Sequence, residues 1–129
     1  MERFAIRRES DVTMAVLGVQ SYARHLGLPE HTIARLSTAV SELANNIVKY
    51  CSGCGGDVII ETTDSEAFLS VQVRDNGPGI GDLKLAMQDH YSTSGTLGLG
   101  LPGVRRIVDR FGIVSVPGEG TVVSIAVKR

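Results

Sequence analysis

The residues best suited to chemistry lie on one predicted helix and at the end of one predicted strand. On the helix, Glu42, Asn46 and Lys49 are spaced by four and then three positions, so an acid, an amide and an amine share one line on its surface. Most such lines are solvated, and a Glu to Lys pair adds only about a few tenths of a kcal/mol to a helix. Asn46, however, is a poor helix former, so its position needs another explanation.

Asp75 ends an alternating run that contains Leu69, Val71 and Val73. This alternation predicts a strand with one buried face. Residues 76–79, Asn-Gly-Pro-Gly, cannot extend the strand, because glycine supplies special backbone angles and proline lacks a donor. The pattern therefore predicts a carboxylate delivered to the mouth of a pocket where the sheet ends. A surface hairpin with a solvated acid is the alternative.

A glycine-rich run at 98–103, Gly-Leu-Gly-Leu-Pro-Gly, precedes a predicted helix. It fits the G-x-G-x-x-G pattern of dinucleotide-binding proteins, but a polar loop rather than a strand comes before it. The chain contains no G-x-x-x-x-G-K-[ST] sequence, which excludes a Walker-type site. Glycines before a helix N-terminus let backbone N–H groups approach an anion, so phosphate is the expected guest. The polar loop at 90–96 is expected to be a mobile lid.

The remaining patterns predict the elements that position these residues. In chain order we expect a short edge strand (4–6), two helices (12–26 and 29–50) and a hairpin (57–62 with 67–74). A short helix (83–88) followed by the lid, a third helix (104–111) and a second hairpin (112–116 with 122–127) complete the chain. Ser10 and Asp11 offer an N-cap for the first helix. The apolar stripes of the second and third helices include Tyr50 and Phe111. This order argues for an α/β two-layer sandwich, with a mixed, mostly antiparallel sheet covered on one face by helices.

Composition narrows the class of protein. At 129 residues and 43% hydrophobic, the chain is expected to form one domain, 1–129, with a core of its own. Thirteen lysine and arginine residues against fourteen aspartate and glutamate residues give a net charge of -1, so no basic field attracts nucleic acid. No long apolar core follows the charged residues at the N-terminus, so no leader is expected. A run of ~18 apolar residues, which a membrane-spanning helix requires, is absent. We therefore expect a cytoplasmic protein without nucleic-acid or membrane partners.

The two cysteines, Cys51 and Cys54, form one Cys-x-x-Cys sequence. It could be half of a zinc site, a redox pair, or two small residues packed in a loop. A structural zinc needs four ligands, and the three histidines have no paired spacing that would supply them. No thioredoxin-like strand precedes the pair. Loop packing is the favoured interpretation, because free cysteine often behaves as a small hydrophobe.

Taken together, four ordered segments resemble the N and glycine motifs of the GHKL ATPase superfamily. They are Ser41-Glu-Leu-Ala-Asn-Asn-Ile-Val-Lys-Tyr50, Asp75-Asn-Gly-Pro-Gly-Ile80, residues 95–101, and Gly120-Thr121. The resemblance covers nearly the whole chain. Within the superfamily the chain is most similar to the small serine kinases and anti-sigma factors of bacterial regulation. It implies the Bergerat ATP-binding fold, and Cys51-x-x-Cys54 is a departure from the family pattern.

The resemblance also implies roles for individual residues. Asp75 would accept a hydrogen bond from the adenine amino group, with Thr121 assisting. Asn46 would bind magnesium together with phosphate oxygens and water. Glu42 would be the general base and Lys49 would face phosphate. The other residues implied at the ATP site, in the purine pocket, the lid and the following helix, are Gly77, Gly79, Ile80, Gly95, Thr96, Leu97, Gly98, Leu99, Gly100, Leu101 and Arg105.

The implied activity is that of an ATP- and magnesium-dependent serine/threonine protein kinase. We expect no attached phosphoacceptor domain in residues 1–129, so the hydroxyl would belong to another protein. By resemblance that protein is a STAS-domain protein of the stressosome or anti-anti-sigma type, and a downstream phosphatase is a further expected partner. The alternatives are an anti-sigma factor that sequesters a sigma factor and phosphorylates its antagonist, and an ATP-gated binding module without phosphate transfer.

Overall fold

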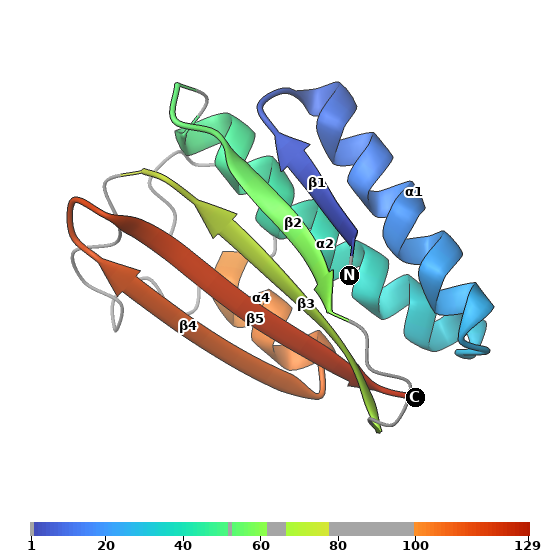
Figure 1. Ribbon diagram of the computed structural model, residues 1–129. Helices are drawn as coiled ribbons and strands as arrows, with labels where there is room; N and C mark the ends of the chain where they lie inside the picture. Colours follow the sequence, from blue (N-terminus) through green and yellow to red (C-terminus); the bar gives the residue numbers. More distant parts are fainter. Residues whose placement is uncertain (1, 52, 62–66, 78–99) are drawn as a thin grey trace.

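The fold consists of a sheet with helices packed on one face (Figure 1). The structure is a computed structural model and describes residues 2–51, 53–61, 67–77 and 100–129. The elements are β1 (Glu2–Ile6), α1 (Glu9–His25), α2 (Glu30–Tyr50), β2 (Gly56–Glu61), β3 (Phe68–Asp75), α4 (Gly100–Ile107), β4 (Arg110–Val116) and β5 (Gly120–Lys128). The predicted short helix at 83–88 and the predicted lid at 90–96 lie outside the described residues.

The sheet has five strands in the order β1-β2-β3-β5-β4. Every neighbouring pair among the described strands is antiparallel. The predicted two-layer α/β sandwich is therefore confirmed, as is the prediction that the first strand lies at an edge. β3 and β5 lie in the interior of the sheet, and each is hydrogen-bonded on both sides.

The core lies between the sheet and the helices, and alternation in the strands determines which side chains enter it. Most helix-facing residues of β3 and β5 are buried, and they include Leu69, Val71, Val123 and Ile125. From α2 the predicted stripe joins them, with Ile33, Leu36, Val40, Leu43 and Ile47 at most 4% exposed. Tyr50 was wrongly predicted to continue this stripe, because it is 52% exposed at the end of the helix. Cys51, 7% exposed, takes the next buried position.

The first helix begins earlier than predicted. Its first residue is Glu9 and its N-cap is Arg8, so the predicted cap at Ser10 or Asp11 is wrong. Asp11 instead sits inside the first turn, where its Oδ2 accepts hydrogen bonds from the backbone N–H groups of Arg7 at 2.9 Å and Arg8 at 3.2 Å. These two bonds hold the pKa of the Asp11 carboxyl below its ordinary value. The carboxylate therefore reaches back to the residues before the helix.

The third helix is also displaced from its predicted position. α4 runs over Gly100–Ile107 rather than 104–111. Pro102 lies in its first turn, where the missing N–H costs nothing because that position has no intrahelical acceptor. Phe111 was predicted for the helix and belongs to β4 instead. With Ile113 and Ser115 it alternates on the less exposed side of that strand.

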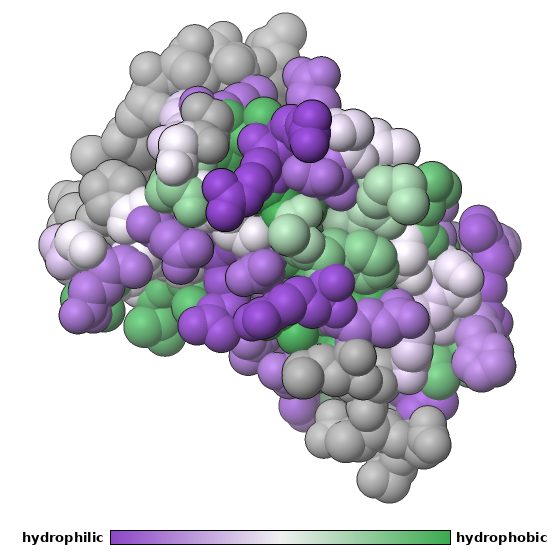
Figure 2. All heavy atoms as spheres, turned by 45° about the horizontal axis from the view of Figure 1, so that its top comes forward, coloured by the Kyte–Doolittle hydropathy of each residue, from purple (hydrophilic) through white to green (hydrophobic). Residues whose placement is uncertain are grey.

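Among the described residues, no helix is both long enough and apolar enough to cross a bilayer. Figure 2 shows hydrophilic and hydrophobic side chains interspersed over the face that it draws.

Candidate functional site

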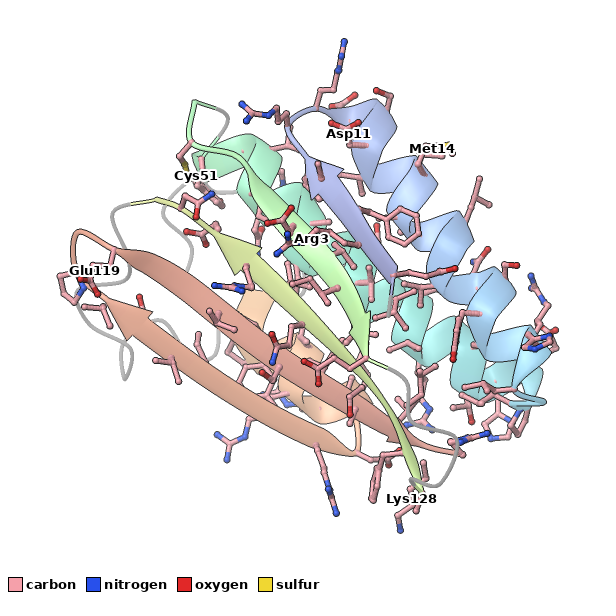
Figure 3. All side chains as sticks on the ribbon, in the orientation of Figure 1. Arg3, Asp11, Met14, Cys51, Glu119 and Lys128 are labelled. Atoms are coloured by element: carbon pink, nitrogen blue, oxygen red, sulfur yellow. A yellow bond between two sulfur atoms is a disulfide. The ribbon has the colours of Figure 1, made fainter. Side chains whose placement is uncertain are left out.

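One end of the sheet carries a row of four residues that run across four strands. Gly56 of β2 pairs with Asp75 of β3, Asp75 pairs with Thr121 of β5, and Thr121 pairs with Ser115 of β4. By strand alternation the row lies on the helix-facing side. Figure 1 shows the C-terminal end of α2 and the turn between β4 and β5 at this same end. Figure 3 labels Cys51 and Glu119 there.

Asp75 ends β3, as the sequence predicts, and its carboxylate is half-buried. Its Oδ1 accepts a hydrogen bond from the backbone N–H of Gly77 at 2.9 Å. This contact is an Asx-turn, in which the Asp side-chain oxygen accepts in place of a backbone carbonyl oxygen. The bond fixes the orientation of the carboxylate, and a carboxylate has further lone pairs that can accept from a ligand.

Thr121 is 7% exposed, and its hydroxyl oxygen lies 2.8 Å from the hydroxyl oxygen of Ser115. Either hydroxyl can donate in this pair. Sequence reasoning missed Ser115, since nothing in a strand pattern distinguishes a serine that supports a threonine on the neighbouring strand. The pair keeps a buried hydroxyl satisfied beside Asp75.

The strand backbones approach unusually closely on both sides of Asp75. A Cβ on Gly120 would lie within 2.5 Å of the Asp75 carbonyl oxygen, and Gly120 has φ of 123°. On the other side, a Cβ on Gly56 would contact the Arg74 carbonyl oxygen and would lie 2.8 Å from Cδ1 of Ile47. Only glycine fits at these positions. The sequence signal for Gly120 was its place directly before Thr121, but the close approach to Asp75 depends on register.

Helix α2 carries the predicted acid and amide to this region. Ile47 packs against Gly56, so the last turns of α2 lie beside the row. Asn46 and Glu42 are half-buried on the same helix, whereas Lys49 is exposed. Glu42 Oε1 accepts a hydrogen bond from the backbone N–H of Gly100 at 3.2 Å. This bond joins Glu42 to Gly100, which is 58 positions later in the chain and begins α4.

The other end of α4 is held by the same helix. Nη1 of Arg35 donates to the carbonyl oxygen of Ile107 at 3.0 Å and lies 3.9 Å from Oδ1 of Asp109. A cation at a helix C-terminus also interacts favourably with the helix dipole. α2 therefore fixes both ends of α4, which places the N-terminus of α4 at Glu42.

The structure brings the predicted site residues together in part. Asp75, Gly77 and Thr121 meet at the end of the sheet, and Glu42 meets Gly100 at the start of α4. On α4 itself, Leu101 is half-buried and Arg105 is exposed. The remaining predicted residues lie outside the described residues, namely Gly79, Ile80, Gly95, Thr96, Leu97, Gly98 and Leu99.

The side-chain oxygens at this site suit a metal ion whose coordination positions are filled mainly by phosphate oxygens and water. Over the described ranges, no group of three His, Cys, Asp or Glu residues could hold an ion without help. Asn46 offers one amide oxygen on the half-buried side of α2. Magnesium prefers few protein ligands and takes its other positions from phosphate oxygens and water. Asn46 therefore fits as a single protein ligand.

The sequence comparison decides the family. A model of the histidine kinase-, DNA gyrase B- and HSP90-like ATPases matches residues 31–129. The chain belongs to this ATPase family. The matched range contains Glu42, Asn46, Asp75 and Thr121.

Relatives within the ATPase family identify the branch. The chain is 44% identical over 117 residues to the serine/threonine-protein kinase RsbT of Bacillus subtilis, covering 90% of this chain and 87% of the relative. It is 29% identical over 127 residues to an anti-sigma F factor of Thermoanaerobacter, covering 95% of this chain and 89% of the relative. These relatives confirm the resemblance to serine/threonine kinases of the switch-kinase and anti-sigma type.

A solved structure supports the fold alone. The crystal structure of RsbU and RsbW domains from Mycobacterium tuberculosis superposes with a TM-score of 0.69 at 15% identity, covering 99% of this chain and 32% of that one. The α/β layer arrangement derived from the alternation and helix patterns is therefore found in a protein of very different sequence.

Proposed function

We propose that this chain is an ATP- and magnesium-dependent serine/threonine protein kinase whose substrate is a STAS-domain regulatory protein. The observation that carries the proposal is the hydrogen bond from the Gly100 N–H to Glu42 Oε1. It joins Glu42, the acid among the three aligned polar residues of α2, to the N-terminus of α4, where backbone N–H groups favour an anion. The proposed proton acceptor would thus adjoin the helix end proposed to bind phosphate.

Glu42 would take the proton of the substrate Ser or Thr hydroxyl. As the hydroxyl oxygen attacks the γ-phosphorus, the bond from that phosphorus to the β,γ-bridging oxygen breaks and ADP leaves. The Gly100 N–H holds one carboxylate oxygen of Glu42, which leaves the other for the proton. Such a base contributes about 10²-fold to 10⁴-fold to the rate, and orientation supplies much of the rest.

The adenine would bind at the sheet end. Asp75 would accept a hydrogen bond from the exocyclic amino group, and Thr121, supported by Ser115, would contribute its hydroxyl beside it. Asn46 would bind magnesium, which when present neutralises charge on the phosphates. Lys49 and Arg105, both exposed, would add positive charge near the phosphates, and the run from Gly95 to Leu101 would supply backbone donors.

The decisive experiment replaces the proposed base while keeping its shape. In Glu42→Gln the side-chain oxygen can still accept from the Gly100 N–H, but the amide cannot take a proton. We expect transfer of labelled phosphate from ATP to a purified STAS-domain protein to fall by about 10²-fold or more, while ATP binding changes by less than about threefold.

Glu9→Gln is the matched control, because Glu9 is an exposed acid in the first turn of α1. It should transfer phosphate like the unmodified chain. Wild-type transfer by Glu42→Gln would remove the general base from the proposal. Absence of transfer by the unmodified chain to any STAS-domain protein would favour ATP-gated binding without chemistry.

A second function is favoured by the likeness to anti-sigma F factors over 95% of the chain. In that role the chain would sequester a sigma factor and phosphorylate the antagonist that releases it. Stable, nucleotide-dependent capture of a purified sigma factor would select this role, and a downstream phosphatase as the partner would select the switch-kinase role. Under either role we propose that residues 1–129 act as one domain in the cytoplasm.

A further inference from the structure

The Cys51-x-x-Cys54 segment lies directly beneath the turn that ends β3. A Cβ built on Gly77 would lie 2.6 Å from Sγ of Cys51 and 3.5 Å from Sγ of Cys54. The same Cβ would lie 3.1 Å from Oδ1 of Asp75. Both sulfurs and the candidate adenine acceptor therefore surround one buried glycine, a juxtaposition that the sequence did not indicate.

Backbone hydrogen bonds tie the two segments together. The N–H groups of Cys54 and Gly55 donate to the Cys51 carbonyl oxygen at 3.1 and 2.9 Å, which forms a tight turn. The Gly55 carbonyl oxygen accepts from the Asn76 N–H at 3.2 Å. A change in the cysteine turn is thus passed to the residue that follows Asp75.

The cysteines form a disulfide in the structure, which the interpretation as simple loop packing did not anticipate. Their Cα atoms are 5.2 Å apart, within the range that a disulfide requires. The reduced form would also have a hydrogen bond, because Sγ of Cys54 lies 3.0 Å from the Cys51 carbonyl oxygen, which can accept from the Cys54 thiol. Closing so short a loop stabilises a fold little compared with closing a long one, so the effect of this bond is local.

We propose that Cys51 and Cys54 are a reversible oxidation site that raises nucleotide affinity in the disulfide form. This inference rests on the proposed function, because it takes the Asp75 end of the sheet as the adenine site. Two thiols cannot approach as closely as two bonded sulfurs, so reduction must move at least one of them. The Cys51 sulfur lies so near Gly77 that a Cβ there would come within 2.6 Å of it, so a sulfur that moves toward Gly77 would press on this turn. Reduction therefore loosens the turn that orients Asp75.

The oxidation needs a low-molecular-weight disulfide such as oxidised glutathione as the oxidant. Cys54 is half-buried while Cys51 is 7% exposed, so the Cys54 thiolate attacks first. This step forms a mixed disulfide and releases one glutathione thiolate. The Cys51 thiolate then attacks the Cys54 sulfur and displaces the second thiolate. The two cysteine protons end on the two glutathione molecules, and two electrons pass from the cysteines to the oxidant.

The test measures ADP binding to the full chain by calorimetry, after oxidation with oxidised glutathione and after full reduction. ADP is the probe because it cannot transfer phosphate. We expect the reduced chain to bind ADP about fivefold more weakly, at the low end of coupling between sites. By reciprocity, saturating ADP must shift the glutathione equilibrium of the cysteine pair by the same factor, measured by the mass change on thiol alkylation.

A Cys51→Ser, Cys54→Ser double variant should bind ADP like the reduced chain and ignore the oxidant. Equal ADP affinity in the two redox states would overturn the inference and leave the nucleotide site intact. Failure of the thiols to pair under oxidised glutathione, or their protection from alkylation by Zn²⁺ alone, would also overturn it. No ADP binding in either state would overturn the proposed function as well, whereas ADP binding that Asp75→Asn weakens but that is equal in the two redox states would overturn the redox inference alone.

Discussion

The two ends of the sheet, on the side that faces the helices, are built differently from the same strands. At one end β3 and β5 bring together Leu69 and Val127, which are at most 1% exposed. At the other end the same pair of strands brings together Asp75 and Thr121. Alternation continues without a break between them, so the change in residue type is not a change of face.

The polar end departs from the pattern expected if stability alone had shaped the sheet. The apolar end is closed by hydrogen bonds around the C-terminus, in which the Lys128 N–H donates to Oδ2 of Asp109 at 2.8 Å. The polar end keeps a half-buried carboxylate where an apolar side chain would bury more area, flanked by two glycines that the close approach of the strands requires. Polar groups placed where a core could continue are expected at functional positions, and the hydrogen bonds of Asp75 and Thr121 limit what their partial burial costs.

The strongest test of this comparison adds one methyl group at the polar end. In Gly120→Ala the new Cβ would meet the Asp75 carbonyl oxygen, and alanine would have to adopt a φ of 123°. We expect the free energy of unfolding to fall by about 3 kcal/mol, measured by chemical denaturation. Gly112→Ala is the matched control, because a Cβ at Gly112 meets nothing within 4 Å. An equal loss in both variants would mean that the close approach of the strands does not matter.

The next test separates the two ends by what they affect. Asp75→Asn should weaken ATP binding by about 1 to 3 kcal/mol, as expected for a lost hydrogen bond to a charged group, with a smaller change in stability. Leu69→Ala should do the reverse, lowering the free energy of unfolding by roughly 3 kcal/mol while folded protein keeps its ATP affinity. Calorimetry and denaturation on both variants check this. If both changes moved the same quantity, the division between the ends would be refuted.

A smaller effect is expected from the support of Thr121. Ser115→Ala removes the hydroxyl that lies 2.8 Å from the Thr121 hydroxyl. We expect a loss of about 1 kcal/mol in stability and a decrease in ATP affinity of about twofold to fivefold, both below the effects of Asp75→Asn. Ser124→Ala, a half-buried serine of β5 on the opposite face, serves as the control. Identical behaviour of the two serine variants would show that the hydroxyl pair has no influence on the site.

The smallest effect concerns an acid outside the row of paired strand residues, in the first turn of α1. Asp11 accepts from the Arg7 and Arg8 N–H groups, and these bonds lower its pKa in the folded state. A lowered folded pKa contributes stability above the unfolded value, which is lost as the pH falls through the folded pKa. Asp11→Asn should therefore flatten the decline in stability below about pH 4, seen in denaturation midpoints. An unchanged acid slope in this variant would contradict the assignment.

Much of the site was predictable because its signals are local. The end of β3 at Asp75 follows from alternation broken by glycine and proline, and the α2 line follows from spacing alone. The errors also have local causes. The stripe from Val104 to Phe111 fits a helical period, but Phe111 equally fits the alternation of β4. The helix was predicted to start at Val104 because Gly100 and Pro102 were both counted with the glycine-rich run before it. A proline is, however, compatible with the first turn of a helix.

What could not be predicted depends on register. The contact of Cys51 with Gly77 and the need for glycine at position 120 both arise because β2, β3 and β5 pair at particular residues. A shift of one position would send different side chains to the helix-facing side. The hydrogen bond between Glu42 and Gly100 likewise depends on how α4 packs on α2. Such facts follow from tertiary packing and have no counterpart in spacing.

The position of β3 and β5 in the interior of the sheet affects which parts of the protein open locally. Peripheral strands open most readily, and β1 and β4 are the peripheral strands here. The backbone that carries Asp75 and Thr121 should exchange its amide protons only in rare openings that approach global unfolding. If Asp75 and Thr121 contact adenine as proposed, opening of the edge strands would then leave these contacts in place.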